Sequence, residues 1–237
     1  DWPQTGGLAP RFQKADLKNK LDKLKEAGIN AVYFQIRTEG DALYDSPIEP
    51  WSKYLTGEEG VPPEPYWDPL MFAVKEAHKR GMELHAWFNP YRAMRSIPSD
   101  FSQKIVLNQE IDPSLEIVLN REFDQDSKMK VSRTSERAAN HVSNTHPEWL
   151  LVMNDKIAIF DPGLQEAIEY NRDIVMDVVN RYDVDGIHFD DYFYHSRNCL
   201  VDGQNYSFMV SSANRGLFCI HRIFAICSSV ICYRARS

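Results

Sequence analysis

The body of this 237-residue chain lacks cysteine: none precedes Cys199, and Cys219, Cys227 and Cys232 follow it. A secreted disulfide framework would place cysteines throughout the chain, and these spacings do not match a zinc site built from two cysteine pairs. The only acid after Cys199 is Asp202. We therefore expect a composition break near His195, with residues 195–237 forming an atypical tail.

Long apolar runs and an excess of positive charge are also missing. The most apolar stretch, residues 217–233, is interrupted by His221 and Arg222 and is shorter than a membrane helix of about 20 residues, so no transmembrane span is expected. Lys and Arg number 27 against 34 Asp and Glu, a net charge of −7, which argues against a nucleic-acid partner. The chain opens without Met or a signal-like apolar segment, so we expect a processed or partial product.

The sequence that is present predicts an α/β fold. At 43% hydrophobic residues, the chain can bury one sizeable core. Apolar side chains at helical spacing predict three helices, and each is followed almost at once by a strand-like run. The expected helices cover residues 13–27, 69–80 and 163–182, and the expected strands cover residues 30–37, 82–89 and 184–190. Helix and strand therefore alternate, which favours parallel strands.

The loop lengths show which end of the sheet carries function. Turns from helix to strand are tight, around Gly28, Gly81 and Asp183, whereas the connections after Arg37 and Asn89 are long. Long loops at the carboxyl ends of strands are typical of a (β/α) barrel, whose active face they build. A doubly wound open sheet shares this rule and remains an alternative.

Alternation along the strands predicts an unusual inner face. One face carries the apolar side chains that should pack under helices. The other carries Tyr33, Gln35 and Arg37, then His85, Trp87 and Asn89, then Gly186, His188 and Asp190. Barrel interiors are mostly filled with branched apolar residues, so this polar and aromatic face favours a ligand cavity. A satisfied polar core is the alternative.

Five segments in the same order resemble the bacterial glycosyl hydrolase-like family 10 proteins. They are residues 21–50, 81–92 (GMELHAWFNPYR), 146–150 (HPEWL), 160–163 (FDPG) and 182–194 (YDVDGIHFDDYFY). The resemblance covers about residues 1–194. It implies a TIM barrel that acts on carbohydrate and an exported, periplasmic or envelope lipoprotein location, with the signal missing here.

The chain departs from that family pattern in three places. It opens after the family's first strand, residues 101–140 look like a loop insertion, and nothing in residues 195–237 resembles the remaining barrel strands. The expectation is therefore a partial (β/α)8 barrel with about three recognisable β/α units over residues 1–194. The tail is interpreted as a frameshifted or misjoined end.

Two adjacent carboxylates, Asp190 and Asp191, are the candidate catalytic residues. Glycoside hydrolysis normally needs two carboxyl groups, one as the acid and one as the nucleophile or base. Adjacent strand residues point to opposite faces, so the pair is poorly placed to flank one bond together, and Asp191 is expected to bind substrate or to share the acid role. We expect Asp190, on the face of His188, to be the principal carboxylate. The second could lie on a later strand.

Further residues are candidates for binding sugar. Polar groups could hold hydroxyls, and aromatic rings could stack on pyranose C–H faces. The candidates are Arg37, Glu39, His85, Trp87, Asn89, Tyr91, Arg92, His188, Tyr192 and Tyr194. No cofactor and no metal site are predicted.

Two other functions stay open. One is a carbohydrate-binding or scaffolding protein without turnover. The other is a metal-dependent hydrolase that would use His85, His188 and Asp190 as ligands.

Overall fold

A computed structural model describes residues 2–97, 137–153, 157–161 and 163–189, together with the backbone of residues 200–201 and 204–205. Most of the expected insertion and most of the expected tail lie outside these ranges. Residues 137–140, counted in the insertion from sequence, belong to the described part and pack on the loop that follows the first strand.

The three expected helices are present at nearly the expected positions. They are α1 (Pro10–Glu26), α3 (Pro69–Lys79) and α6 (Gln165–Arg181). Proline at the first turn starts α1 and α3, and the Asp68 side chain caps α3 by accepting from the Met71 amide at 2.9 Å. Gly28 and Gly81 follow α1 and α3 with φ of 81° and 63°, a left-handed backbone that favours glycine.

The three expected strands form one parallel sheet. They are β1 (Ala31–Arg37), β2 (Glu83–Phe88) and β6 (Gly186–Phe189), hydrogen-bonded in the order β1-β2-β6. Tyr33 is in register with His85, and Trp87 with His188. Up to Gln35 and Trp87, residues expected on one face therefore stand beside each other across the sheet, as the alternation predicted. A register shift after Gln35 places Arg37 opposite Phe88, not opposite Asn89 as the alternation would require.

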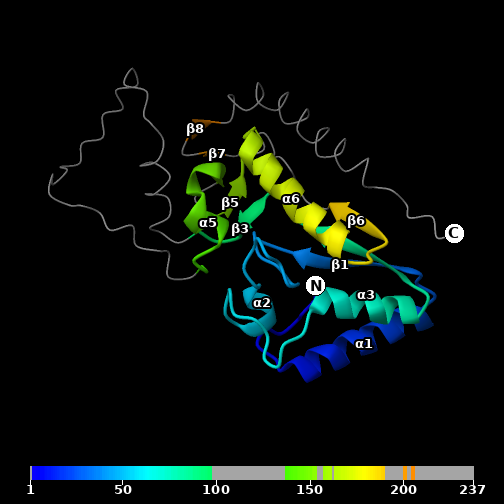
Figure 1. The fold of residues 1–237 in the computed structure, drawn as a ribbon. Helices are drawn as coiled ribbons and strands as arrows, with labels where there is room; N and C mark the ends of the chain where they lie inside the picture. The colour runs from blue at the N-terminus through cyan, green and yellow to red at the C-terminus, as the bar shows by residue number, and fades with distance from the viewer. Residues whose placement is uncertain are drawn as a thin grey trace, which may run out of the picture.

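The apolar faces of sheet and helices form one core. Phe34 and Ile36 of β1 and Leu84, Ala86 and Phe88 of β2 are buried in the same cluster as the inner sides of α1, α3 and α6. Figure 1 shows α1 and α3 side by side, with α6 in a separate position near β6. Asp185, just before β6, accepts from the Leu84 amide at 2.8 Å and lies 2.7 Å from His78 Nε2 of α3, which fixes β6 against its neighbours.

A second sheet was not predicted. It has the strand order β3-β5-β4-β7-β8, and its described pairings are antiparallel. Its strands are β3 (Arg92–Met94), β4 (Leu150–Met153), β5 (Ile157–Phe160), β7 (Leu200–Val201) and β8 (Gln204–Asn205). Short helices α2 (Lys53–Thr56) and α5 (Val142–Thr145) and a 3-10 turn at Pro147–Trp149 complete the described elements. The long loops thus carry their own structure.

Candidate functional site

Aromatic and imidazole rings gather on the inner face of the parallel sheet. The Tyr33 ring centroid lies 4.6 Å from that of His188 and 5.2 Å from that of His85, and Trp87 lies 6.2 Å from His188. All three strands contribute, as the alternation predicted. Tyr33 is 55% exposed, so this end of the inner face is open in the described chain.

Gly186 makes room for one of these rings. A Cβ at this position would lie 2.4 Å from His85 Nδ1, closer than real side chains approach. The imidazole therefore packs directly over the backbone of β6.

The carboxyl end of β1 carries a buried ion pair between Arg37 and Glu49. Arg37 Nε and Nη2 donate to the two carboxylate oxygens of Glu49 at 2.7 and 2.6 Å, and Arg37 Nη1 donates to the carbonyls of Asn89 and Pro90, both at 2.9 Å. The pair joins the loop after β1 to the loop after β2. The guanidinium also lies over the Phe160 ring of β5, which brings the second sheet to the same place.

Burial acts on both members of this pair. Burial lowers the pKa of Arg37, but the Glu49 carboxylate outweighs it and the net shift is upward. Burial also raises the pKa of Glu49, while Arg37 opposes that rise. A guanidinium keeps its proton and here donates to both carboxylate oxygens, so we assign the pair as ionised.

A second ionic network centres on Glu39, two residues further along. Its Oε1 accepts from the Tyr54 hydroxyl at 2.6 Å, and its Oε2 accepts from the Arg95 amide at 3.0 Å and from Arg137 Nη2 at 2.6 Å. Arg137 Nη1 donates to Glu59 at 2.7 Å. Burial raises the pKa of Glu39, yet these hydrogen bonds and Arg137 outweigh it and hold the pKa below its ordinary value. Glu39 is therefore an ionised, fully engaged carboxylate.

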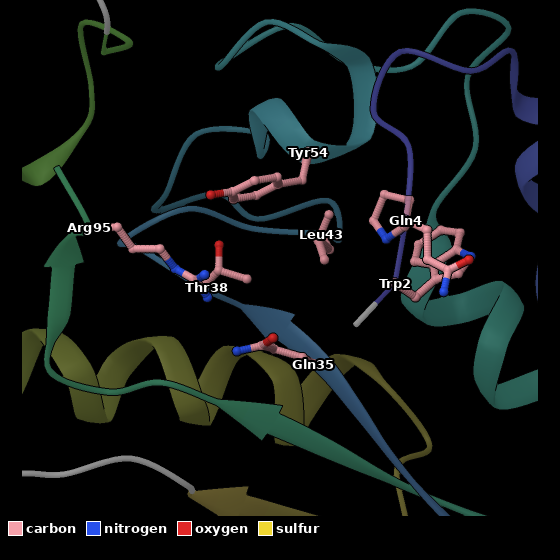
Figure 2. Close-up of a pocket in the computed structure, with 8 residues that line it drawn as sticks. Trp2, Gln4, Gln35, Thr38, Leu43, Tyr54 and Arg95 are labelled. Atoms are coloured by element: carbon pink, nitrogen blue, oxygen red, sulfur yellow. The ribbon is translucent and has the colours of Figure 1, made fainter.

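A pocket of about 500 Å³ opens beside this network at the end of β1. Figure 2 shows Tyr54, Thr38 and Arg95 toward one end of it and Trp2 and Gln4 toward the other, with Gln35 of β1 below. Thr38 directly follows β1, and its hydroxyl donates to Asp41 Oδ1 at 2.7 Å. The pocket thus lies where a barrel active face is expected.

The remaining sequence candidates divide into two groups. Asn89 and Tyr91 are buried behind the end of β2, and Arg92 begins β3, its amide donating to Asn89 Oδ1 at 3.3 Å. The catalytic candidates Asp190 and Asp191, together with Tyr192 and Tyr194, lie outside the described residues. The roles of all these residues stay predictions.

The structure adds residues that the sequence did not point to as parts of a site. Arg137, Glu59 and Glu49 form the buried ion pairs, and Thr38 and Arg95 line the pocket. Each reaches its partner through a loop, with no periodic spacing that would reveal it. Arg37 and Glu39 were correctly expected at the strand end, but their contacts in the described residues are with the protein itself.

The expectations about a metal site and a transmembrane span can be compared with the described residues only. Within the described ranges, His, Cys, Asp and Glu side chains form no group of three or more that could hold a metal ion. Asp190 lies outside those ranges, so the metal-dependent alternative is not tested. No helix in the described part is long and apolar enough to cross a membrane.

The parallel strands with helices packed on one side, and with long loops at their carboxyl ends, define part of a TIM barrel. A solved structure of the same fold is the α-galactosidase from Lactobacillus brevis, at TM-score 0.50 and 11% identity, covering 96% of this chain and 25% of that one. The chain belongs to the Glycosyl hydrolase-like 10 family, which matches residues 1–209.

Two curated relatives agree with this membership. Glycosyl hydrolase YngK of Bacillus subtilis is 35% identical over 194 residues, which are 82% of this chain and 31% of the relative. Glycosyl hydrolase DigH of Escherichia coli K12 is 36% identical over 201 residues, which are 82% of this chain and 39% of the relative. The chain thus spans 31% of the length of one of these relatives and 39% of the other.

Proposed function

We propose that this chain carries part of the active face of a glycoside hydrolase that cleaves O-glycosidic bonds in a bacterial envelope or environmental polysaccharide. The observation that carries the proposal is the polar pocket at the carboxyl end of β1, in a chain of a glycosyl hydrolase-like family. Catalytic groups of such barrels come from the strand ends on this side.

Asp190 is the proposed catalytic carboxylate. It directly follows Phe189, the last residue of β6, and alternation from the inward His188 predicts the same face for it. Asp191 is proposed to bind substrate or to share the acid role. A carboxylate at the end of this strand would face the same side of the sheet as the pocket.

Glu39 is a poor candidate for the second catalytic acid. A general acid must hold a proton at working pH and release it to the leaving group. Glu39 is 1% exposed, its pKa is held below the ordinary value by Tyr54, Arg95 and Arg137, and both of its oxygens already accept hydrogen bonds. We propose that it shapes the pocket wall.

The test replaces, in a full-length relative, the residue that corresponds to Asp190. Asp190→Asn should lower the rate of glycan cleavage by a factor of about 10² to 10⁴, because one proton-transfer or nucleophilic group is lost. Asp191→Asn is the matched variant and should lose less. Release of reducing ends from defined polysaccharides is the measurement, and an unchanged rate in the Asp190→Asn variant would remove this assignment.

A carbohydrate-binding protein without turnover is the second candidate. It is favoured by the pairing of the buried acids Glu39 and Glu49 with arginines, which leaves neither carboxylate available to react. Glycan titration run beside the reducing-end assay separates the two functions. Saturable binding by a full-length relative without product release would support the binding protein.

A further inference from the structure

Two residues that line the pocket carry hydroxyl groups that donate their protons to buried carboxylates. The Tyr54 hydroxyl donates to Glu39 Oε1 at 2.6 Å, and the Thr38 hydroxyl donates to Asp41 Oδ1 at 2.7 Å. A hydroxyl has one proton and two lone pairs. Toward a ligand, each of these two groups can therefore only accept a hydrogen bond.

The direction of both hydrogen bonds is imposed by the buried acids. Glu39 is ionised, and its other oxygen is occupied by Arg137 and the Arg95 amide. Asp41 Oδ1 already accepts from the amides of Thr38 at 3.1 Å and Glu39 at 2.8 Å, so it has no proton to give to the Thr38 hydroxyl. Neither hydroxyl can reverse without breaking these bonds.

We propose that this pocket is a sugar subsite that selects hydrogen-bond donors of the ligand, with Glu39 and Asp41 imposing that selection through Tyr54 and Thr38. The inference rests on the proposed carbohydrate function and deepens it. Tyr54 and Thr38 would contact the sugar directly, whereas Glu39, Asp41 and Arg137 are positioning residues.

The rest of the pocket narrows the ligand class. Arg95 is half-exposed and lines the pocket beside Thr38, and because a guanidinium carries only hydrogen-bond donors, it calls for a ligand oxygen that accepts. Trp2 offers a partly buried ring at the other end. A sugar ring combines donating hydroxyls, accepting oxygens and apolar C–H faces, and a pocket of about 500 Å³ lies in the range of small-molecule sites.

An anionic ligand fits this pocket less well. The Arg95 guanidinium lies 3.5 Å from Glu39, so a carboxylate already offsets part of its charge. The lone pairs of Thr38 and Tyr54 would also face the anion. The proposed ligand is therefore a neutral sugar unit that donates hydrogen bonds at two positions.

The experiment measures binding alone, by saturation-transfer NMR and titration of the 237-residue chain. The probes are methyl glycosides of glucose, galactose and N-acetylglucosamine. For the best binder, each hydroxyl is replaced in turn by hydrogen and by fluorine, neither of which donates. At two positions both replacements should weaken binding about two- to tenfold, the size of one neutral hydrogen bond.

Variants assign each position to its residue. In the Tyr54→Phe variant, replacing one of the two ligand hydroxyls should no longer weaken binding, because the protein partner of that hydroxyl is gone. In Thr38→Val, replacing the second ligand hydroxyl should no longer weaken binding. In Thr38→Ser, which keeps the protein hydroxyl, that second replacement should still weaken it. Tyr66→Phe is the matched control, since the Tyr66 hydroxyl also donates to a carboxylate, Asp45 at 2.8 Å, but does not line the pocket. Circular dichroism checks that each variant is folded.

Several results would overturn the proposal. One is that no methyl glycoside binds, and another is that every fluorinated analogue binds as well as its parent. The others are that Tyr54→Phe and Tyr66→Phe behave alike, or that inorganic phosphate competes with the sugar. The proposed hydrolase function can be refuted independently of the subsite. If binding selects donors but the Asp190→Asn variant still cleaves, the subsite proposal stands and the catalytic assignment fails. If the Asp190→Asn variant loses cleavage but binding shows no donor selectivity, only the subsite proposal fails.

Discussion

The two ends of strand β1 reverse the usual relation between chemistry and burial. Tyr33, an aromatic residue near the amino end, is 55% exposed, whereas Arg37, a cation at the carboxyl end, is 1% exposed. A register shift between Gln35 and Arg37 separates the two ends. In the described residues, loop groups enclose the carboxyl end, where Glu49 after β1 and the carbonyls of Asn89 and Pro90 after β2 contact the Arg37 guanidinium.

Covering the carboxyl end requires compensation for each charge that is buried there. Arg37 is stabilised by Glu49 and two carbonyls, and Arg137 by Glu39 and Glu59. A buried charge without such partners would be strongly unfavourable. At the amino end, His85 Nε2 lies 3.0 Å from the exposed Glu83 carboxylate, and Tyr33 makes ring contacts with His85 and His188.

Removing the cation at the covered end should have the largest effect. Arg37→Met leaves the Glu49 carboxylate buried without its partner, so we expect the free energy of unfolding to fall by about 3–5 kcal/mol, measured by urea denaturation. The double variant Arg37→Met with Glu49→Leu should regain part of this loss. A single-variant loss below about 1 kcal/mol, the value of an exposed pair, would contradict the buried-pair assignment.

Glu39→Gln should have an intermediate effect that depends on pH. The pKa of Glu39 in the folded chain is below its ordinary value of 4.5, so the unfolded chain binds the proton more readily. Its stabilisation is therefore complete above pH 4.5 and is lost as the pH falls through the lower folded pKa. At neutral pH we expect Glu39→Gln to lose about 1–3 kcal/mol.

The pH dependence supplies the measurement and its control. Urea denaturation from pH 7 down to the acid limit should show a smaller acid loss for Glu39→Gln than for the unchanged chain. Glu26→Gln, at an exposed position at the end of α1, should leave the acid limb nearly unchanged. Parallel curves for the unchanged chain and Glu39→Gln would show that the Glu39 network does not stabilise the fold through its charge.

At the open end of the strand, the smallest effect is expected from Tyr33→Thr. Its side chain is more than half exposed, and threonine keeps strand propensity, so the free energy of unfolding should change by less than about 1 kcal/mol. Phe34→Ala, the buried neighbour on the opposite face, should lose about 3–5 kcal/mol in the same denaturation experiment. Similar losses in both variants would mean that Tyr33 is covered in solution.

The sequence predicted the parallel sheet and its helices to within a few residues. Helical spacing, proline at the first turn and a terminal glycine are local signals, and so is alternation in β1 and β2. The second sheet escaped prediction because its strands are two to four residues long and β3 pairs with β5, far along the chain. Such short segments carry too little pattern to distinguish them from loop.

For the candidate site, sequence and structure contribute different parts. The sequence by itself determined which residues stand on the inner face and that Arg37 and Glu39 come at or just beyond the end of a strand, because both follow from a two-residue period. Only the tertiary structure decided that Glu49 pairs with Arg37 and Arg137 with Glu39, and that Tyr54 and Thr38 line one pocket. Glu49 lies in a loop 12 residues from Arg37, and Arg137 lies 98 residues from Glu39. Chain closure and burial, not local spacing, therefore fix these contacts.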